Sequence, residues 1–353
     1  MDISKIDKNF EIKQATEING NVFNLPCKPF TIKGGLHTQE DGFIRMPLNV
    51  AKNVSDSVLT LSSVTPGVRV LFSTDSSVMK IYAKMPSKCI MHHMAPVGSM
   101  SFTLVEVIDG KECFVCNLVP PQEGDDLIGQ CNFFRGKKMR DYILYFPLYS
   151  KVSSLRLEFD SDSTVCEYKK YREDVKPILY YGSSITGGGC ASKANNCYQA
   201  YISEWLNVDF MNLGFSGAAK AEPAMCEYLS NVDCSVFVYD YDHNAPNADY
   251  LEQTHYKLYK TFRSNEKNKN TPIVIISKPG EYIVKDRVER ATVIKNTYLK
   301  ALSEGDKNVY FIDGINLFPD KVRDHCTVDG IHPNDLGFYY MAEKIYEVIK
   351  NLI

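Results

Sequence analysis

The sequence predicts an α/β fold, a doubly wound parallel-sheet domain, preceded by an all-β domain of the β-sandwich or jelly-roll type. Residues 1–170 contain many short runs in which apolar and polar residues alternate, with turn signals between them. This pattern is typical of antiparallel sheets with one buried face. Residues 175–353 contain short, continuous apolar runs separated by helical patterns. Such runs indicate a parallel sheet that helices cover on both faces.

Alternating runs predict the strands of the first domain. They cover residues 68–75, 78–84, 101–108, 112–119, 140–148 and 154–159. Turn residues separate them, such as the Thr-Pro-Gly of residues 65–67 and the Asp-Ser-Ser of residues 75–77. The charged run at residues 167–174 follows the last strands, and we interpret it as the linker to the second domain.

Continuous apolar runs predict the strands of the second domain, at residues 178–181, 208–213, 235–239, 273–277 and 309–312. Helical patterns cover residues 197–206, 222–230, 249–264, 286–303 and 335–351. Strands and helices that alternate in this way form a doubly wound sheet, which binds ligands beyond the carboxyl ends of its strands. We therefore expect the functional residues at these strand ends.

Two segments far apart in the chain predict a serine hydrolase. Asp329 stands three residues before His332, a spacing at which the carboxylate can orient the imidazole and stabilise its charged form. Ser184 follows the apolar run at residues 178–181 and supplies a hydroxyl nucleophile for that base. The expected catalytic residues are therefore Ser184, His332 and Asp329.

Acyl transfer also requires hydrogen-bond donors for the oxyanion of the tetrahedral intermediate. Gly217 follows the second apolar run and offers a backbone N–H, whereas Asn244 follows the third and offers a side-chain amide. Together with the N–H of Ser184, they are the expected oxyanion donors. Asn212 is the alternative to Asn244.

The segments around Ser184 and His332 resemble blocks of the SGNH (GDSL-type) hydrolase superfamily, which is named after its Ser, Gly, Asn and His residues. Residues 182–186, Gly-Ser-Ser-Ile-Thr, are similar to the family's Gly-Asp-Ser-x-Thr, with Ser183 in place of Asp. Residues 329–333, Asp-Gly-Ile-His-Pro, are similar to its Asp-x-x-His-Pro. The resemblance implies that Ser184 is the nucleophile.

The resemblance assigns Gly217 to the second block of the family and Asn244 to the third. The third block departs from the family's Gly-x-Asn-Asp, because Asp242 stands for Gly and Ala245 for Asp. The longer run at residues 182–192 is more similar to one bacterial subgroup, which joins an N-terminal β-domain to the hydrolase and includes carbohydrate O-acetylesterases. That subgroup carries a Gly-x-Asp-Leu-Tyr signature in its β-domain. The matching segment here is Gly-Ser-Met-Ser-Phe at 98–102, so the resemblance is weaker over the first half.

The resemblance implies an esterase that removes small acyl groups, above all acetyl from a carbohydrate hydroxyl. The expected substrate is thus a small-molecule or oligosaccharide ester, and the reaction needs no metal or organic cofactor. A general acylhydrolase acting on lipids, aryl esters or thioesters is the first alternative. The second is a non-catalytic carbohydrate-binding protein whose α/β domain is a relic.

Composition excludes several other classes of function. The net charge of −3 provides no basic surface for nucleic acid, and no apolar run approaches the length of a membrane span. Residues 1–10 are charged and lack an apolar core, so no signal peptide is expected. The 11 cysteines are an odd number, which favours a reducing compartment and predicts a cytoplasmic location.

Several other residues have chemistry that could compete with these assignments. His243 and His325 are possible bases, but we interpret both as structural or solvated residues. Cys190 lies near the proposed nucleophile and is interpreted as a packing residue. Cys113 and Cys116 form a CxxC pair without a second pair at zinc-binding spacing, so a structural role is expected.

Overall fold

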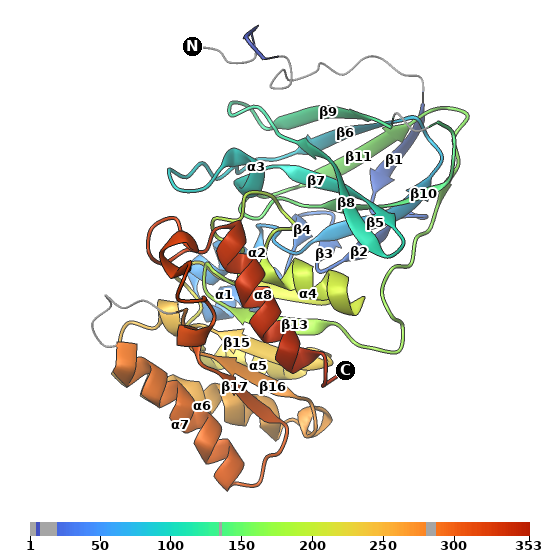
Figure 1. Ribbon diagram of the computed structural model, residues 1–353. Coiled ribbons are helices and arrows are strands. Elements are labelled where there is room, and N and C mark those ends of the chain that lie inside the picture. The colour runs from blue at the N-terminus through green and yellow to red at the C-terminus, as the bar shows by residue number, and fades with distance from the viewer. Residues whose placement is uncertain (1–4, 8–19, 134–135, 280–286) are drawn as a thin grey trace.

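The computed structural model describes residues 5–7, 20–133, 136–279 and 287–353. An antiparallel, β-rich part precedes an α/β part with a parallel sheet, and the two lie directly against each other (Figure 1). The predicted fold class is therefore confirmed.

The β-rich part contains two antiparallel sheets. One has the order β1-β11-β6-β9, and the other has the order β12-β5-β10-β7-β8 with β2 also paired to β5. The strands are β1 Asn21–Leu25, β2 Thr31–Lys33, β5 Arg69–Thr74, β6 Val78–Lys84, β7 Phe102–Ile108, β8 Lys111–Leu118, β9 Asp126–Asn132, β10 Arg140–Tyr145, β11 Ser154–Phe159 and β12 Val165–Cys166. Side chains from both sheets, among them Phe72, Ile81, Leu104 and Leu157, form one apolar core.

The sheet that contains β5 is buried on both faces. Alternate residues of β5 and β10, including Leu71 and Ile143, point away from the sandwich core and join a second core. That second core also contains Ile178 and Tyr198 of the α/β part. The apolar core therefore continues from one part into the other, and removing either part would expose apolar surface on its partner.

The segment before β5 differs from the prediction of an all-β region. After the paired strands β3 (Leu36–Thr38) and β4 (Gly42–Ile44) come two helices, α1 (Leu48–Val54) and α2 (Asp56–Ser62). The side chain of Ser55 accepts a hydrogen bond from the Val58 N–H at 3.2 Å and so caps α2. Met46, Ala51 and Val58 pack into the core of the α/β part. A further short helix, α3, spans Pro96–Ser99.

The α/β part contains a parallel sheet of order β14-β13-β15-β16-β17. Its strands are β13 Ile178–Gly182, β14 Phe210–Gly214, β15 Val236–Asp240, β16 Ile273–Ile276 and β17 Val309–Ile312. Its helices are α4 Tyr198–Leu206, α5 Pro223–Asn231, α6 Ala248–Ser264, α7 Arg287–Ser303 and α8 Asp335–Ile349. Each of these elements coincides with a predicted one to within a few residues.

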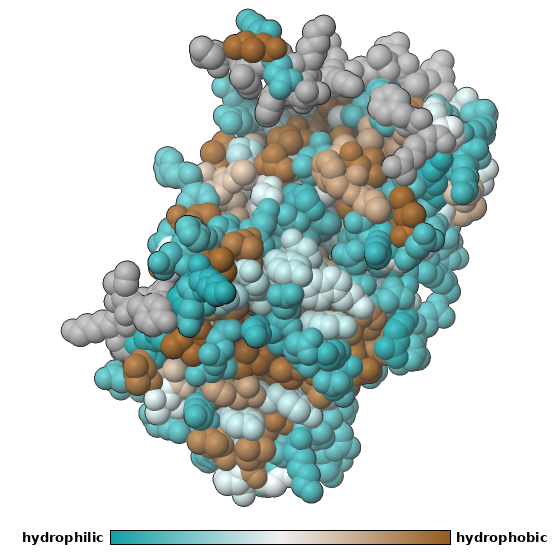
Figure 2. Space-filling model, viewed as in Figure 1, coloured by the Kyte–Doolittle hydropathy of each residue, from teal (hydrophilic) through white to brown (hydrophobic). Residues whose placement is uncertain are grey.

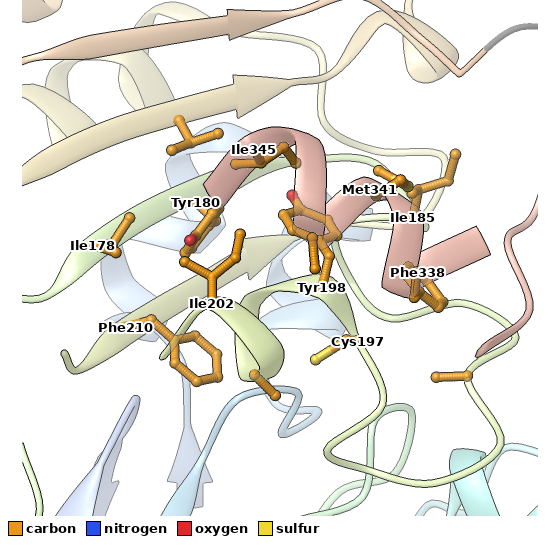
Figure 3. Packing of buried hydrophobic residues seen from close by; sticks show 14 of the residues in the cluster. Ile178, Tyr180, Ile185, Cys197, Tyr198, Ile202, Phe210, Phe338, Met341 and Ile345 are labelled. Atoms are coloured by element: carbon orange, nitrogen blue, oxygen red, sulfur yellow. The ribbon is translucent and has the colours of Figure 1, made fainter. Parts of the chain in front are cut away.

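Helices cover both faces of the parallel sheet. On one face, side chains of α4 and α8 pack on β13 and its neighbours, and Figure 3 shows this packing for Ile178, Tyr180, Tyr198, Ile202, Met341 and Ile345. Side chains of α1, α5, α6 and α7 pack on the other face. The order of the strands reverses at β13, because β14 lies on one side of it and β15 on the other. A crevice for a ligand is expected at the carboxyl end of such a strand.

Two buried arginines of the β-rich part insert into the α/β part. The Arg45 guanidinium donates to the backbone carbonyl oxygens of Asn212 at 3.1 Å and Gly214 at 2.7 Å, at the end of β14. Burial lowers the pKa of Arg45 to about 9. Arg69 forms a buried ion pair with Asp209. The two parts are thus joined by specific polar contacts as well as by a shared core.

The predicted linker at residues 167–174 packs against the β-rich part. Lys170 forms a buried ion pair with Glu112 of β8, and the Tyr171 hydroxyl accepts a hydrogen bond from Arg69 at 2.6 Å.

Within the described residues, none of the helices combines the length and apolarity needed to cross a membrane. Hydrophilic side chains cover much of the face seen in Figure 2, with hydrophobic groups in separate patches.

Candidate active site

Ser184 lies in the turn that follows β13, at the predicted end of the sheet. Its side chain is half-buried, and its Oγ lies 3.0 Å from Nε2 of His332. The turn begins at Gly182, where a Cβ atom would lie 1.7 Å from Oδ1 of Asp240. Only glycine therefore lets the chain pass this carboxyl group on its way to Ser184.

The carboxyl group of Asp240 lies beneath the turn that carries Ser184. It accepts hydrogen bonds from the hydroxyl of Thr186 and, at 3.4 Å, from that of Tyr198. Burial raises the pKa of Asp240 to about 7, although these hydrogen bonds oppose the increase. Asp240 thus supports the turn from inside the protein.

His332 and Asp329 lie in the segment that leads into α8. Oδ2 of Asp329 lies 2.7 Å from Nδ1 of His332, and Oδ1 accepts the backbone N–H groups of Ile331 at 3.0 Å and His332 at 2.7 Å. Burial raises the pKa of Asp329, but these hydrogen bonds outweigh it and lower the value to about 2. The ionised carboxylate favours the tautomer with a proton on Nδ1, which leaves the lone pair of Nε2 directed at Ser184.

Gly217 and Asn244 lie beyond the ends of β14 and β15, and they bond to each other. The Gly217 N–H donates to Oδ1 of Asn244 at 3.2 Å, and Nδ2 of Asn244 donates to the carbonyl oxygen of Phe215 at 2.7 Å. Gly217 has a φ of +68°, a conformation that favours glycine. Among the described residues, neither the Ser184 N–H nor the second N–H of the Asn244 amide donates to a protein acceptor. These two donors are therefore free to bind a ligand.

The glycine run after Ser184 allows the chain to fold closely around it. A Cβ atom on Gly189 would lie 2.9 Å from the carbonyl oxygen of Ser184 and 3.4 Å from Cδ2 of His332. The next residue, Cys190, is buried and has a φ of +77°. The loop thus passes directly beside both proposed catalytic residues.

Sequence reasoning missed Tyr149, which comes from the β-rich part. Its hydroxyl donates to the carbonyl oxygen of Ser184 at 3.0 Å and accepts a hydrogen bond from Oγ of Ser216, also at 3.0 Å. Tyr149 therefore connects the turn that carries Ser184 with the loop that leads to Gly217. No motif marks this residue, because the contact depends on how the two parts of the chain pack.

Two more residues of the β-rich part border the site. The His93 ring lies 5.4 Å from the His332 ring, measured between centroids. A Cβ atom on Gly98, the first residue of the segment matched to the β-domain signature, would lie 2.1 Å from the carbonyl oxygen of Ala191. The β-rich part therefore contacts the loop that follows Ser184.

Neither His243 nor His325, the other two candidate bases, is hydrogen-bonded to Ser184 in the described part of the chain. Burial, followed by the positive charge of Lys278, lowers the pKa of His243 to about 3. Asp240 stands three residues before His243, but its carboxyl group has other partners. His325 is exposed, and its backbone carbonyl accepts a hydrogen bond from the side chain of Asn334. Within the described residues, Ser184 is bonded to His332 alone among histidines.

Asn212 and the CxxC pair have other partners. The Asn212 amide donates to the Thr186 carbonyl oxygen at 2.7 Å, and its oxygen accepts the Gly214 N–H at 2.9 Å. The Cys116 thiol lies in a hydrogen bond with Cys131, which together with burial raises its pKa. In the described part of the chain, a single group of three His, Cys, Asp or Glu side chains is close enough to hold a metal ion, and it does not include the CxxC pair.

Comparison with family models identifies the chain. Residues 175–350 match the GDSL-like lipase/acylhydrolase family, and residues 23–165 match the N-terminal domain (GxDLY) of SGNH-hydrolase-type esterases. The protein therefore belongs to the SGNH (GDSL-type) hydrolase superfamily, in the group that carries an N-terminal β-domain, and it is a hydrolase of the esterase class. No curated protein matches the chain in sequence.

Solved structures share this architecture over nearly the whole chain. A protein described as a GDSL-like lipase from Bacteroides ovatus is 26% identical, with a TM-score of 0.84 over 94% of this chain and 98% of its own. The salicylyl-acyltransferase SsfX3 of a tetracycline biosynthetic pathway is 15% identical, with a TM-score of 0.78 over 94% and 97%. A family two carbohydrate esterase from Clostridium thermocellum is 15% identical, with a TM-score of 0.59 over 82% and 93%. The last two likenesses concern the fold alone.

Proposed function

We propose that this hydrolase is a serine esterase that removes small acyl groups, specifically acetyl groups from O-acetylated carbohydrate. The observation that carries the proposal is the line of contacts from Ser184 Oγ to His332 Nε2, 3.0 Å, and from His332 Nδ1 to Asp329, 2.7 Å. This line lies at the carboxyl end of β13, where a doubly wound sheet binds its ligand. A relic domain would have no physical need to keep all three groups in contact.

The first half of the reaction forms an acyl-enzyme. Ser184 Oγ attacks the ester carbonyl carbon while its proton passes to Nε2 of His332, and the carboxylate of Asp329 stabilises the imidazolium. The imidazolium then gives the proton to the leaving alkoxide as the ester C–O bond breaks. The products of this half are the free sugar hydroxyl and an acyl group on Ser184.

The second half repeats the chemistry with water. His332 takes a proton from a water molecule that attacks the acyl carbonyl, and it returns that proton to Oγ as the acid departs. Every proton has a donor and an acceptor among Ser184, His332, the substrate and water. The mechanism therefore calls for no cofactor.

The oxyanion of both intermediates needs donors that point at it. The Ser184 N–H and the second N–H of the Asn244 amide are suited to this role. The bond from Asn244 Nδ2 to Phe215 fixes the orientation of the amide before substrate arrives. The Gly217 N–H donates to Asn244 here, so it can bind the oxyanion only when that hydrogen bond is shared or exchanged.

The acetylated carbohydrate is supported by the subgroup resemblance and by the β-domain that the chain shares with it. Structural neighbours include family two carbohydrate esterases and an acetyl xylan esterase from Butyrivibrio proteoclasticus. A general acylhydrolase is the second candidate, favoured by the higher TM-score of the GDSL-like lipase. Both candidates use the same catalytic residues and differ in acyl chain and alcohol.

Acyl-chain and alcohol specificity separate these candidates. Turnover should be measured on aryl acetate, butyrate and octanoate, and acetate release on acetylated oligosaccharides should be followed by mass spectrometry. We expect acetate to be preferred and the oligosaccharides to be deacetylated. Preference for octanoate, with no acetate released from sugars, would support the general acylhydrolase instead. No turnover of any ester by folded protein would refute both.

A further inference from the structure

Three potential metal ligands meet beside the proposed nucleophile. A ring nitrogen of His93, the sulfur of Cys190 and a ring nitrogen of His332 all lie within 4.8 Å of one another. His93 is exposed, Cys190 is buried and His332 is half-buried. The three residues come from separate segments, and His93 belongs to the β-rich part. Packing of the two parts therefore creates this group.

The hydrogen bonding of His332 suits a metal ligand as well as a base. A metal-bound histidine usually donates its other ring N–H to a carboxylate, which orients the ring and raises its basicity. Asp329 accepts from Nδ1 of His332 at 2.7 Å and so fills this role. The lone pair on Nε2 that would accept the Ser184 proton is the same lone pair that would bind a metal. Proton transfer and metal binding at this atom are mutually exclusive.

Cys190 restricts which metal the group can hold. Its φ of +77° is a strained conformation for a residue with a side chain, and it places the sulfur beside two imidazoles. One sulfur and two imidazole nitrogens are ligands that suit a thiophilic metal ion, whereas Mg²⁺ and Ca²⁺ prefer oxygen ligands.

We propose that His93, Cys190 and His332 form a binding site for a thiophilic divalent metal ion such as Zn²⁺, and that the bound ion switches the esterase off. Imidazole nitrogen and thiolate sulfur are both zinc ligands, and a zinc site with three protein ligands holds water in the fourth position. The inhibitory part of this inference rests on the proposed function, because it needs His332 to be the base. The binding part does not.

Metal binding replaces the thiol proton of Cys190 with the metal ion, and this exchange is reversible. On binding, the Cys190 thiol releases its proton to solvent, and the metal bonds to one sulfur and two nitrogens. Ser184 keeps its own proton but loses the acceptor on His332, so it can no longer attack an ester. When a chelator removes the metal, the Cys190 thiolate takes up a proton from solvent, and the hydrogen bond between Ser184 and His332 forms again.

Cobalt(II) spectroscopy tests the site without any assay of activity. Titration of the metal-free full-length protein with Co²⁺ should produce visible bands of a four-coordinate ion and a near-ultraviolet sulfur-to-cobalt band. Cys190→Ser should remove the sulfur band, and His93→Ala should weaken binding at least about tenfold. His92→Ala, which changes the adjacent exposed histidine, is the matched control and should bind as wild type. Absence of the sulfur band in wild type, or its survival in Cys190→Ser, would overturn the site.

Zinc inhibition then tests the switch. Zn²⁺ should abolish turnover of aryl acetate, and a chelator should restore it. His93→Ala should need at least about tenfold more Zn²⁺ for the same fractional inhibition, each variant being compared with its own metal-free rate. Activation by Zn²⁺, or equal sensitivity of His93→Ala and wild type, would overturn the inhibitory role. A protein that binds Co²⁺ through Cys190 but hydrolyses no ester would refute the proposed function and leave the metal site standing.

Discussion

The Tyr149 hydroxyl donates a hydrogen bond to the carbonyl oxygen of Ser184, 3.0 Å away. Tyr149 belongs to the β-rich part, whereas Ser184 lies in the turn after β13 of the α/β part. The same hydroxyl accepts a hydrogen bond from Ser216 at 3.0 Å. One side chain of the β-rich part therefore connects the turn that carries Ser184 to the loop that leads to Gly217. The β-rich part thus helps to position the proposed catalytic groups.

Tyr149→Phe should lower turnover of aryl acetate about fivefold, because it removes a hydrogen bond of about 1 kcal/mol that positions Ser184. Apparent substrate binding should change little. Steady-state kinetics give both quantities. Tyr145→Phe is the control, since it removes a buried hydroxyl that bonds to Glu112 at 2.9 Å. Equal losses in the two variants would mean that general destabilisation, and not positioning, explains the effect.

Asn244→Ala should raise the activation free energy by about 2 to 4 kcal/mol and so lower the turnover number, with little change in apparent substrate binding. Asn244→Asp should be more harmful, because it keeps the acceptor for Gly217 but places a negative charge beside the oxyanion. Asn247→Ala, which removes the cap of α6, controls for lost stability. If turnover stayed at the wild-type level in Asn244→Ala, the oxyanion donor would have to be another group.

The raised pKa of Asp240 predicts that the free energy of unfolding falls as pH rises. The folded protein holds the proton with a pKa of about 7, whereas the ordinary value is 3.8, so the unfolded chain ionises first. Stability from this group is complete below about pH 4 and is lost between pH 4 and 7. Asp240→Asn should remove this part of the dependence, while the neighbouring charge of Asp242 stays in both proteins. Thermal unfolding from pH 5 to 8 measures the difference, and parallel curves would contradict the prediction.

Loss of one partner of the buried ion pair between Arg69 and Asp209 should lower the free energy of unfolding substantially. Asp209→Asn leaves the Arg69 guanidinium, which is fully buried, without its charged partner and should cost about 3 kcal/mol of unfolding free energy. Denaturant unfolding of Asp209→Asn, Arg69→Met and the double variant provides the coupling energy. The double variant should lose less than the sum of the single losses. Additive losses would show that the pair does not act as a unit.

The α/β part was predictable because its local signals agree with its fold. Continuous apolar runs correspond to strands buried on both faces, as in β13, and each is followed by an amphipathic helix. The helices α1 and α2 were missed, since each has only 7 residues and the apolar positions are too few to establish a period. Both helices pack against the α/β part, so one apolar core contains residues from both sides of position 170. The domain boundary near residue 170 stays a prediction.

The site was predictable only in part. The spacing of Asp329 and His332 and the position of Ser184 after a strand led us to expect that these side chains meet, and the structure brings them together. Their catalytic roles stay predictions. Tyr149 and His93 could not be found in this way, since their approach to Ser184 and His332 depends on the packing of two distant segments. The sequence also suggested Gly217 and Asn244 as parallel donors, whereas the structure bonds one to the other.

The most direct test of the account is the site of covalent labelling by a fluorophosphonate. The protein should be labelled, digested and analysed by mass spectrometry with fragmentation that distinguishes Ser183 from Ser184. Ser183 is fully buried, and its Oγ accepts the Ile185 N–H at 3.2 Å, so Ser183→Ala is the matched control. We expect label on Ser184 alone. Ser184→Ala should lose the label and several orders of magnitude in turnover, whereas Ser183→Ala should retain both. Label on another serine, or turnover preserved in folded Ser184→Ala, would contradict the assignment of Ser184 as the nucleophile.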